Sequence, residues 1–372
     1  MVSKALHALT AAPGPELFAA LRDALSGAGP AVLPLLPGQA KDALAALRPT
    51  HVDGVRQPAG AGVPDEVAVV IATSGSTGAP KGVQLSAAAL HAAAAVQLRR
   101  VEAAPGERWL CCLPPSHISG LQVLVRSAVT GSEPIIHDGF SPAEVLGSGA
   151  DHVSLVPTQL HRLVERGADL SVFRTILLGG AAPRPGLLEE ARALGARVVT
   201  TYGMSETSGG CVYDGRPLDQ VDVKIGEDGR IHVAGPMLFS GYRFEEFAGP
   251  WFVTSDLGEL VGGRLRVLGR ADDVINTGGE KVVAVQVAAV LSAHPEVADV
   301  AVVGCPDPEW GERVVAVVVP ADAARPPTLA QLRAYAKSRL PSYCAPRELR
   351  LLPSLPLLPN GKTDVVRLRV GT

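Results

Sequence analysis

The sequence has no long run of basic residues, no cysteine pair spaced CxxC and no apolar stretch long enough to cross a bilayer. Its formal net charge is −3, so its charge favours neither a nucleic acid nor an anionic membrane surface as a partner. For the five cysteines we expect reduced, buried thiols in a cytoplasmic protein. The first residues also lack the apolar core of a signal peptide.

With 372 residues the chain has room for two domains and a sizeable core. We expect helices punctuated by Pro and Gly over residues 1–60, a buried β-branched strand at 67–72 and an alanine-rich helix at 86–101. Short strands then alternate with helices, which predicts an α/β fold with largely parallel, helix-covered sheets. The predicted strands are 108–113, 134–137, 152–156, 175–178 and 197–201, and the helices are 120–129, 158–166 and 184–194.

The pattern becomes rich in β-strand segments near residue 230, and a compact α+β unit follows Asp272. We therefore place the domain boundary there, with a large domain at 1–271 and a small one at 272–372. The predicted elements of the small domain are helices at 285–292 and 329–340 and strands at 297–304 and 312–319.

The segment 73–81 combines hydroxyl side chains with two glycines, and it directly follows the predicted buried strand. Such a loop allows backbone N–H groups to approach phosphate oxygens, and a lysine adds positive charge there. It is not a Walker A sequence, because Pro80 stands where that motif needs Gly and Gly82 follows Lys81. Taken alone, the loop could equally be a plain turn. The residues assigned to phosphate binding are Thr73, Ser74, Gly75, Ser76, Thr77, Gly78 and Lys81.

This run, Thr-Ser-Gly-Ser-Thr-Gly-x-Pro-Lys-Gly, resembles the phosphate loop of the adenylate-forming superfamily, which includes the acyl-CoA synthetases. Further stretches that resemble the same family follow in the same order, at 202–206, 254–256, 269–275, 278–282, 307–312 and 359–362. The resemblance covers residues 67 to 364. It implies a large N-terminal domain with helix-covered sheets, a small mobile C-terminal domain, and ATP-dependent ligation of a carboxylic acid to coenzyme A with Mg²⁺.

The resemblance also implies roles for single residues. Lys362 would bridge the acid carboxylate and the α-phosphate, and Ser205 would donate a hydrogen bond to that phosphate. Glu206 would hold Mg²⁺, a hard cation that prefers oxygen ligands. The ring of Tyr202 would stack on adenine. The remaining implied contacts are Gly203, Met204, Gly180 and Ala181 around the nucleotide, Asp256 and Arg270 at the ribose, Gly278 and Gly279 along the pantetheine chain, and Asp272 as the hinge.

The stretch 117–121, His-Ile-Ser-Gly-Leu, resembles the o-succinylbenzoate–CoA ligases, the menaquinone-pathway branch of the family. It implies that His117 and Ser119 line the acid pocket. The acid of that branch carries a second carboxylate, and Arg126 is a candidate to bind it bidentately. A structural salt bridge or a surface role for Arg126 remains open. Few residues precede the phosphate loop, so the N-terminal subdomain must be abbreviated.

Three alternatives stay open. The chain could ligate another aryl or medium-chain acid to coenzyme A, or it could load a separate carrier protein. It could also be a nucleotide-binding protein without catalysis, although Lys362, Glu206 and Asp256 together argue against this. Members of the family are often homodimers, and the sequence identifies no interface.

Overall fold

The computed structural model describes residues 3–10, 12–36, 38, 40–73, 80–356 and 363–370. Internal contacts divide the chain into two compact units. The first unit comprises Met1–Val223, Val233–Phe252 and Gly262–Leu265. The second comprises Lys224–His232, Val253–Val261 and Arg266–Thr372, so it also gathers segments that precede Asp272. A domain boundary at Asp272 stays a prediction.

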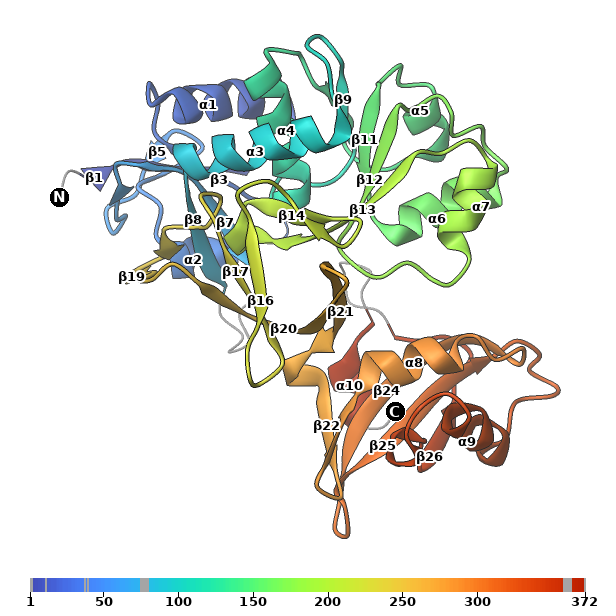
Figure 1. Cartoon of the computed structure of the whole chain (residues 1–372). Coiled ribbons are helices and arrows are strands. Elements are labelled where there is room, and N and C mark those ends of the chain that lie inside the picture. Colours follow the sequence, from blue (N-terminus) through green and yellow to red (C-terminus); the bar gives the residue numbers. More distant parts are fainter. Residues whose placement is uncertain are drawn as a thin grey trace. The chain divides into compact units, whose positions relative to one another are not determined.

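An eight-stranded mixed sheet forms one half of the first unit (Figure 1). Its strands in spatial order are β19 (Glu245–Glu246), β18 (Gly241–Tyr242), β8 (Lys81–Ser86), β7 (Val67–Thr73), β3 (Ala31–Pro34), β2 (Leu6–Leu9), β4 (His51–Val52) and β5 (Val55–Arg56). The strands β1 (Ser3–Lys4) and β6 (Val63–Pro64) form a separate two-stranded antiparallel sheet. The sheet is parallel from β7 through β3 and β2 to β4, and antiparallel at both ends.

A seven-stranded sheet forms the other half of this unit. Its strands in spatial order are β10 (Ile135–Ile136), β9 (Trp109–Cys111), β11 (His152–Leu155), β12 (Thr175–Leu178), β13 (Val198–Met204), β14 (Gly209–Tyr213) and β15 (Arg216–Pro217). From β10 to β13 all neighbours are parallel, which confirms the predicted β–α alternation. A separate four-stranded sheet, most of whose residues belong to the second unit, joins β16 (Asp222–Ile225), β17 (Arg230–Ala234), β20 (Phe252–Val261) and β21 (Arg264–Arg270).

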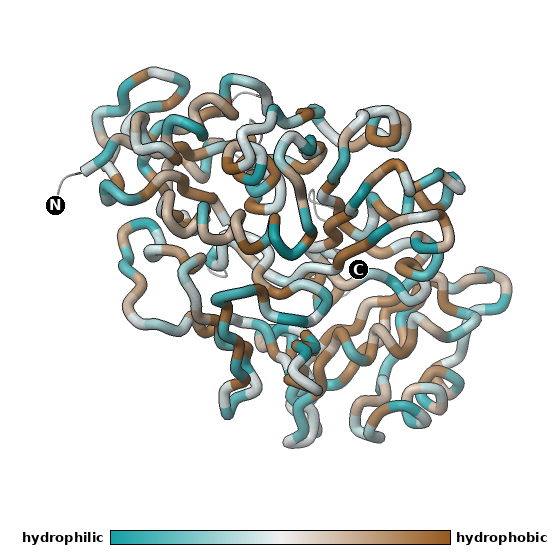
Figure 2. The backbone as a smooth tube through the Cα atoms, turned by 45° about the horizontal axis from the view of Figure 1, so that its top comes forward, coloured by the Kyte–Doolittle hydropathy of each residue, from teal (hydrophilic) through white to brown (hydrophobic). Residues whose placement is uncertain are grey.

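Helices cover both large sheets. The helices α1 (Pro15–Ser26), α3 (Ala87–Val101) and α4 (Ile118–Thr130) contact one another and form a layer between the two sheets. The outer face of the seven-stranded sheet packs against α5 (Pro142–Leu146), α6 (Pro157–Glu165) and α7 (Leu187–Ala193) through one apolar core (Figure 1). The helix α2 (Ala40–Leu47) packs on the eight-stranded sheet. Figure 2 shows that hydrophobic stretches of the tube run along these strands and helices, whereas many turns are hydrophilic.

The sequence suggested only helices over the first sixty residues, but the structure also has strands there. Strands β1 to β5 lie there beside α1 and α2. The runs that form β2 and β3 are four residues each, which is too short for an apolar run to distinguish strand from helix by its periodicity. Their burial between neighbouring strands decides the conformation: the apolar side chains of Leu6, Ala8, Ala31 and Leu33 are fully buried.

Arg243 ties the early part of the chain to the edge of the eight-stranded sheet. Its guanidinium donates hydrogen bonds to the backbone carbonyls of Leu47, Ala61 and Gly62, at 3.0, 2.6 and 2.7 Å. Burial lowers the pKa of Arg243, because the charged group has left water. The three carbonyls compensate for that loss of hydration by accepting charge-assisted hydrogen bonds.

A polar cluster, largely buried, lies where β9 and β11 of the seven-stranded sheet begin. The carboxylate of Glu107 accepts hydrogen bonds from His152 Nε2 at 2.8 Å and from the backbone N–H of Ala104, and it pairs with Arg174. The ring of His152 stacks on that of Trp109, with centroids 4.5 Å apart. Burial lowers the pKa of His152, so near neutral pH this histidine is an uncharged partner of Glu107.

The five cysteines are buried and none forms a disulfide, which confirms that part of the expectation from sequence. Burial raises the pKa of the Cys111 thiol to about 12. Within the described ranges, the chain forms no helix with both the length and the apolar character needed to cross a membrane.

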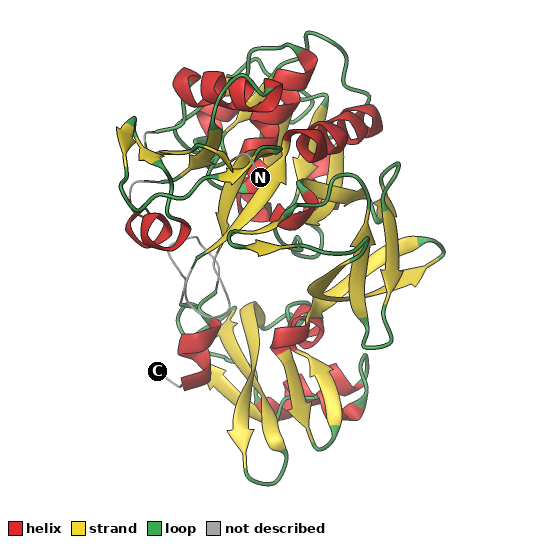
Figure 3. Ribbon diagram, turned by 90° about the vertical axis from the view of Figure 1, so that its left-hand side faces the viewer, coloured by secondary structure: helices red, strands yellow, loops and turns green. Residues whose placement is uncertain are grey.

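The second unit is built on a long antiparallel hairpin of β24 (Val297–Asp307) and β25 (Gly311–Pro320), visible in Figure 3 as a pair of long strands. The strand β26 (Glu348–Leu351) and the hairpin β22 (Val274–Thr277) and β23 (Glu280–Val283) extend the sheet. Side chains alternate along β24 and β25. One set packs on α8 (Ala284–Leu291) and α9 (Leu329–Lys337), and the other packs on α10 (Val365–Val370). The helices and strands predicted here are confirmed within a few residues.

The Glu107 cluster provides a stability test. Changing Glu107 to Gln removes the charge that pairs with Arg174 and receives the His152 hydrogen bond. We expect the free energy of unfolding to fall by about 1 to 3 kcal/mol, because the buried His152 and the half-exposed Arg174 both lose a charged acceptor. Glu102→Gln is the matched control, since Glu102 pairs with Arg197 at 3.7 Å but is 79% exposed. Urea unfolding would measure both variants, and equal losses would contradict the role of burial.

Candidate active site

Four neighbouring parallel strands, β9, β11, β12 and β13, end at the same edge of the seven-stranded sheet. The loops that leave this edge are 112–117 before α4, residues 156–157 before α6, residues 179–180 after β12, and the short 3₁₀ turn Ser205–Thr207 after β13. Ligands of open α/β sheets bind at this edge, because the loops there expose backbone groups and helix N-termini. The topology thus brings together the predicted adenine-binding and acid-binding segments.

The loop after β12 lies against β13. A Cβ atom added to Gly179 would lie 2.3 Å from Oγ1 of Thr201, so a side chain does not fit. The next residue, Gly180, has φ +85°, a conformation that L side chains rarely adopt. Two consecutive glycines are therefore required by the path of the chain itself. Both glycines lie in the stretch 178–183, for which the resemblance implies a place beside the adenine.

The segment 202–206 is held in place by its pairing with β14 and by the hydrogen bonds of Ser208. A side chain on Gly203 would meet the backbone oxygen of Gly209 at 2.0 Å, because β13 and β14 approach closely at a bulge. Ser208 then adopts φ 49°, and its carbonyl accepts a hydrogen bond from Gln122 Nε2 at 2.5 Å. Its hydroxyl donates to the carbonyl of Met237 at 2.8 Å. Ser205 is buried and Glu206 is half-buried, and this turn holds both at the strand end.

The His-Ile-Ser-Gly run begins α4. His117 is the N-cap residue, and the side chains of His117 and Ser119 are exposed. Gly120 allows the helix to pass the preceding loop, because a Cβ there would lie 2.4 Å from the carbonyl oxygen of Pro114. The first turn of α4 also reaches the start of β14, which follows the 3₁₀ turn: a Cβ on Gly209 would lie 3.7 Å from Cγ1 of Ile118. His117 and Ser119 thus start a helix that packs on the segment carrying Glu206.

Three charged or polar side chains meet at the edge of the eight-stranded sheet. The hydroxyl of Tyr242 donates a hydrogen bond to Oε1 of Glu206 at 2.8 Å. Nζ of Lys81 lies 5.1 Å from the centroid of the same ring, within the range of a cation–π contact. Burial and the neighbouring Glu206 raise the pKa of Tyr242, so its hydroxyl keeps the proton that it donates. One aromatic ring thus contacts both the predicted phosphate lysine and the predicted magnesium ligand.

The predicted phosphate loop connects two antiparallel strands. Thr73 at the end of β7 pairs with Lys81 at the start of β8, and Thr73 Oγ1 donates to the carbonyl of Lys81 at 3.3 Å. The interior of the loop, which contains Ser74, Gly75, Ser76, Thr77 and Gly78, lies outside the described residues, as does Lys362. The structure therefore describes both ends of the loop.

The predicted ribose ligands belong to the second unit. Arg270 lies with Nη1 3.8 Å from Oδ1 of Asp256, and its Nη2 donates to Oδ2 of Asp272 at 2.8 Å. Burial of Arg270 opposes its charge, but the hydrogen bond to Asp272 and the nearby carboxylates raise its pKa. Asp272, the predicted hinge, lies in the 3₁₀ turn Ala271–Asp273 directly after β21. Arg270 thus joins the predicted ribose carboxylate to the predicted hinge residue.

Gly278 and Gly279 form the two-residue turn of the β22–β23 hairpin. Both have positive φ, 61° and 84°, as a tight hairpin turn requires. A Cβ on Gly278 would lie 2.6 Å from the ring of Trp310, whereas Gly279 has open space around it. Local geometry therefore accounts for both glycines, and their predicted contact with pantetheine stays a prediction.

The sequence profile of the AMP-binding enzymes matches residues 19–243, and that of the AMP-binding enzyme C-terminal domain matches residues 286–362. The chain belongs to the AMP-binding enzyme family. A probable 2-succinylbenzoate–CoA ligase of Mycobacterium tuberculosis is 44% identical over 97% of this chain and 96% of its own length. These matches confirm the adenylate-forming fold with its two successive domains.

Solved structures of this family agree with the fold. The o-succinylbenzoate CoA synthetase of Bacillus subtilis in complex with the acyl-adenylate OSB-AMP has a TM-score of 0.85 at 28% identity. The match covers 99% of this chain and 89% of that chain. The same synthetase in complex with ATP and magnesium has a TM-score of 0.84, also at 28% identity, and covers 99% of this chain and 90% of that chain.

Arg126 does not lie where a substrate carboxylate would reach it. Only 3% of its surface is exposed, and its guanidinium donates to Oε1 of Gln97 at 3.0 Å and to Oγ of Ser154 at 2.9 Å. The same group lies 4.2 Å from the ring centroid of Trp109. The prediction that Arg126 recognises the acid is therefore corrected: here it joins α3, α4 and β11 inside the core of this AMP-binding enzyme.

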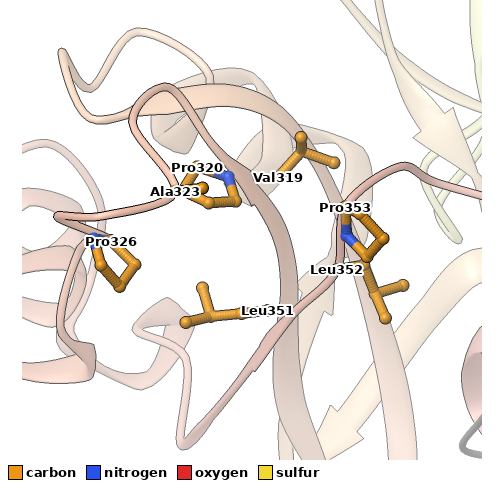
Figure 4. A pocket seen from close by; sticks show the side chains of 7 residues that line it. All are labelled: Val319, Pro320, Ala323, Pro326, Leu351, Leu352 and Pro353. Atoms are coloured by element: carbon orange, nitrogen blue, oxygen red, sulfur yellow. The ribbon is translucent and has the colours of Figure 1, made fainter.

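Figure 4 shows a hollow of about 370 Å³ in the second unit, lined only by apolar side chains from the ends of β25 and β26 and the turns beside them. None of the predicted site residues lines it. Within the described part of the chain, no three His, Cys, Asp or Glu side chains form a group that could hold a metal. A cation at Glu206 would therefore depend on one protein carboxylate together with ligand oxygens, as Mg²⁺ in phosphate sites usually does.

The sequence analysis missed two residues of this site. Tyr242 and Gln122 carry no motif signal of their own, since their roles arise from contacts with segments distant in sequence.

Gly120 provides a test of how the acid-binding segment is built. Gly120→Ala would place a Cβ against the carbonyls of Pro114 and Leu113, which are backbone atoms and cannot rotate away. We expect thermal unfolding to show a loss of about 1 to 3 kcal/mol, because overpacking forces the loop to shift. Gly139→Ala is the control, since a Cβ there meets nothing within 4 Å. An unchanged Gly120→Ala protein would contradict the close approach.

Proposed function

We propose that this chain is an ATP-dependent ligase that joins 2-succinylbenzoate to coenzyme A, as in menaquinone biosynthesis. The observation that carries the proposal is the 44% identity with a probable 2-succinylbenzoate–CoA ligase over nearly the full length of both chains. The His-Ile-Ser-Gly run supports it, because it begins the helix beside the predicted adenylate segment. The abbreviated N-terminal region is no obstacle, since that relative matches over 96% of its own length.

The nucleotide would bind at the carboxyl edge of the seven-stranded sheet. The backbone of Gly179 and Gly180 can approach adenine closely, because neither residue carries a Cβ. The half-buried ring of Tyr202 offers a stacking surface on β13. In the second unit, the carboxylate of Asp256 and the guanidinium of Arg270 would bind the ribose hydroxyls.

Glu206 fits the role of a magnesium ligand. Its half-buried carboxylate offers hard oxygen atoms, and Lys81 lies over the ring of the same tyrosine as a cation for the outer phosphates. Mg²⁺, when bound, would offset the negative charge of the phosphates. Glu206 would orient the cation, and Lys81 would attract the pyrophosphate that leaves.

Two reactions would follow one another. First, a carboxylate oxygen of the acid attacks the α-phosphorus of ATP, the bond to the β-phosphate oxygen breaks, and pyrophosphate leaves. Lys362 would offset the charge that repels these two anions. Second, the thiolate of coenzyme A attacks the acyl carbon, and the bond to AMP breaks. His117 and Ser119, both exposed at the start of α4, would line the pocket of the acid.

Pyrophosphate release would test this proposal directly. The assay supplies ATP and Mg²⁺ with 2-succinylbenzoate, benzoate or octanoate, each with and without coenzyme A. We expect turnover with 2-succinylbenzoate, and a thioester product only when coenzyme A is present. Turnover with a control acid alone would contradict the substrate assignment but keep the ligase. No turnover with any acid would favour carrier loading or simple nucleotide binding.

Lys362→Ala separates the two reactions. We expect pyrophosphate release to fall by about 100-fold or more, because the charge on the attacked phosphate loses its partner. Thioester formation from supplied acyl-adenylate should fall much less, since that step does not join two anions at the α-phosphate. Lys337→Ala, an exposed lysine in the last turn of α9, is the control and should leave both rates unchanged. Full adenylation by Lys362→Ala would contradict this mechanism.

A further inference from the structure

Tyr242 stands at the junction of three structural elements of the first unit. It belongs to the two-residue strand β18, which pairs with β8 so that Tyr242 lies opposite Val83. Its carbonyl accepts a hydrogen bond from Gln84 Nε2 at 3.2 Å, and its ring packs edge-on against Phe239 with centroids 5.0 Å apart. The backbone and the ring are therefore both held in place, and the hydroxyl points to a fixed position.

That position is the carboxylate of Glu206. The phenol donates to Oε1 at 2.8 Å, and the backbone N–H of Phe239 donates to the carbonyl of Glu206 at 2.9 Å. The short segment from Phe239 to Tyr242 thus binds both the side chain and the backbone of Glu206. Because Oε1 is bound by a fixed donor, Oε2 of the same carboxylate points in a defined direction. A freely rotating glutamate would lack that orientation.

The ammonium group of Lys81 lies over the ring of Tyr242, 5.1 Å from its centroid. A direct ion pair between these oppositely charged side chains would neutralise both. Among the described residues, no salt bridge within 4.0 Å joins Lys81 to Glu206. The tyrosine contacts the two charges separately, so both remain directed to a ligand.

We propose that Tyr242 is a positioning residue that orients Glu206 for a magnesium–nucleotide ligand and holds Lys81 apart from it. The inference rests on the proposed function, because it concerns the ligand of that site. A tyrosine suits this task better than a charged residue, because it can donate to a carboxylate and accept a cation on its face without adding charge. Groups that hold a metal-ligating carboxylate in place affect metal affinity strongly, although they do not touch the metal.

Calorimetric titration of the protein with ATP, in the absence of any acid, tests the inference without turnover. Tyr242→Phe keeps the ring for Lys81 and removes only the donor to Glu206. We expect the Mg²⁺ concentration needed for half-maximal ATP binding to rise about tenfold. Binding of AMP without metal should not change, since AMP lacks the outer phosphates. Tyr242→Leu removes the ring as well, and we expect it to weaken ATP binding further.

Two controls separate positioning from a structural role. Tyr335→Phe loses a similar hydrogen bond, from its hydroxyl to the carbonyl of Ala293 at 2.9 Å, and should change neither titration. In a Glu206→Gln background, Tyr242→Phe should add less than about a twofold change, because the two residues act through one contact. This double variant also shows whether the effect passes through Glu206.

The outcomes are distinct. An unchanged Mg²⁺ dependence in Tyr242→Phe, or an equal loss of AMP and ATP binding, would overturn the inference and leave the proposed function intact. A full additional loss in the Glu206→Gln background would also overturn it. Absence of Mg²⁺-dependent ATP binding by the unmodified protein would instead overturn the proposed function, and this inference with it.

Discussion

Parallel pairing of β9, β11, β12 and β13 is the constraint on which the candidate site depends. Parallel neighbours all end at the same edge, so four loops that are far apart in the sequence must share a small space there. Each loop has little choice of path, because another loop or strand lies beside it. The candidate acid-binding and adenine-binding segments and the carboxylate of Glu206 are close for this reason, before any specific contact between side chains is considered.

Crowding at that edge explains several glycines that would otherwise be assigned to ligand binding alone. Gly120, Gly179 and Gly203 each lie where an added Cβ would come within 2.4 Å of another atom. Their absence of a side chain permits the loops to pass one another, because the space that a Cβ would take is filled by other atoms of the protein. Packing alone therefore accounts for these three glycines, and a motif glycine in this fold is not by itself evidence for a contact with substrate.

Much of the fold was predictable where local patterns were long. The β-branched run of β7, the alanine-rich α3 and the alternation from β9 to β13 were all found from sequence. The strand β8 was missed, because its sequence begins with Lys-Gly and its pairing with β7 depends on the hairpin and not on composition. Short strands in the first sixty residues were missed for the reason that four apolar residues have no visible period.

The candidate site was only partly predictable, because some of its contacts join residues that are far apart in the sequence. Motifs located Glu206, Lys81 and His117, since each stands in a recognisable run. The partner of Glu206, however, is 36 residues away on a two-residue strand, and no local pattern marks it. Arg126 failed in the opposite way: its position nine residues after His117 suggested a ligand for the second carboxylate, but the neighbouring helix α3 supplies Gln97 and encloses it.

Arg243 has a consequence for synthesis of the chain. Its hydrogen bonds reach back 181 residues to Gly62 and 182 to Ala61. A ribosome adds about 5 to 20 residues per second, so the loop that ends with Gly62 waits about 10 to 40 s for the side chain that fastens it. During that time the growing chain carries a sheet whose edge strand β8 has not yet received β18. The nascent protein is therefore open to association with chaperones for longer than its early, apolar strands alone would suggest.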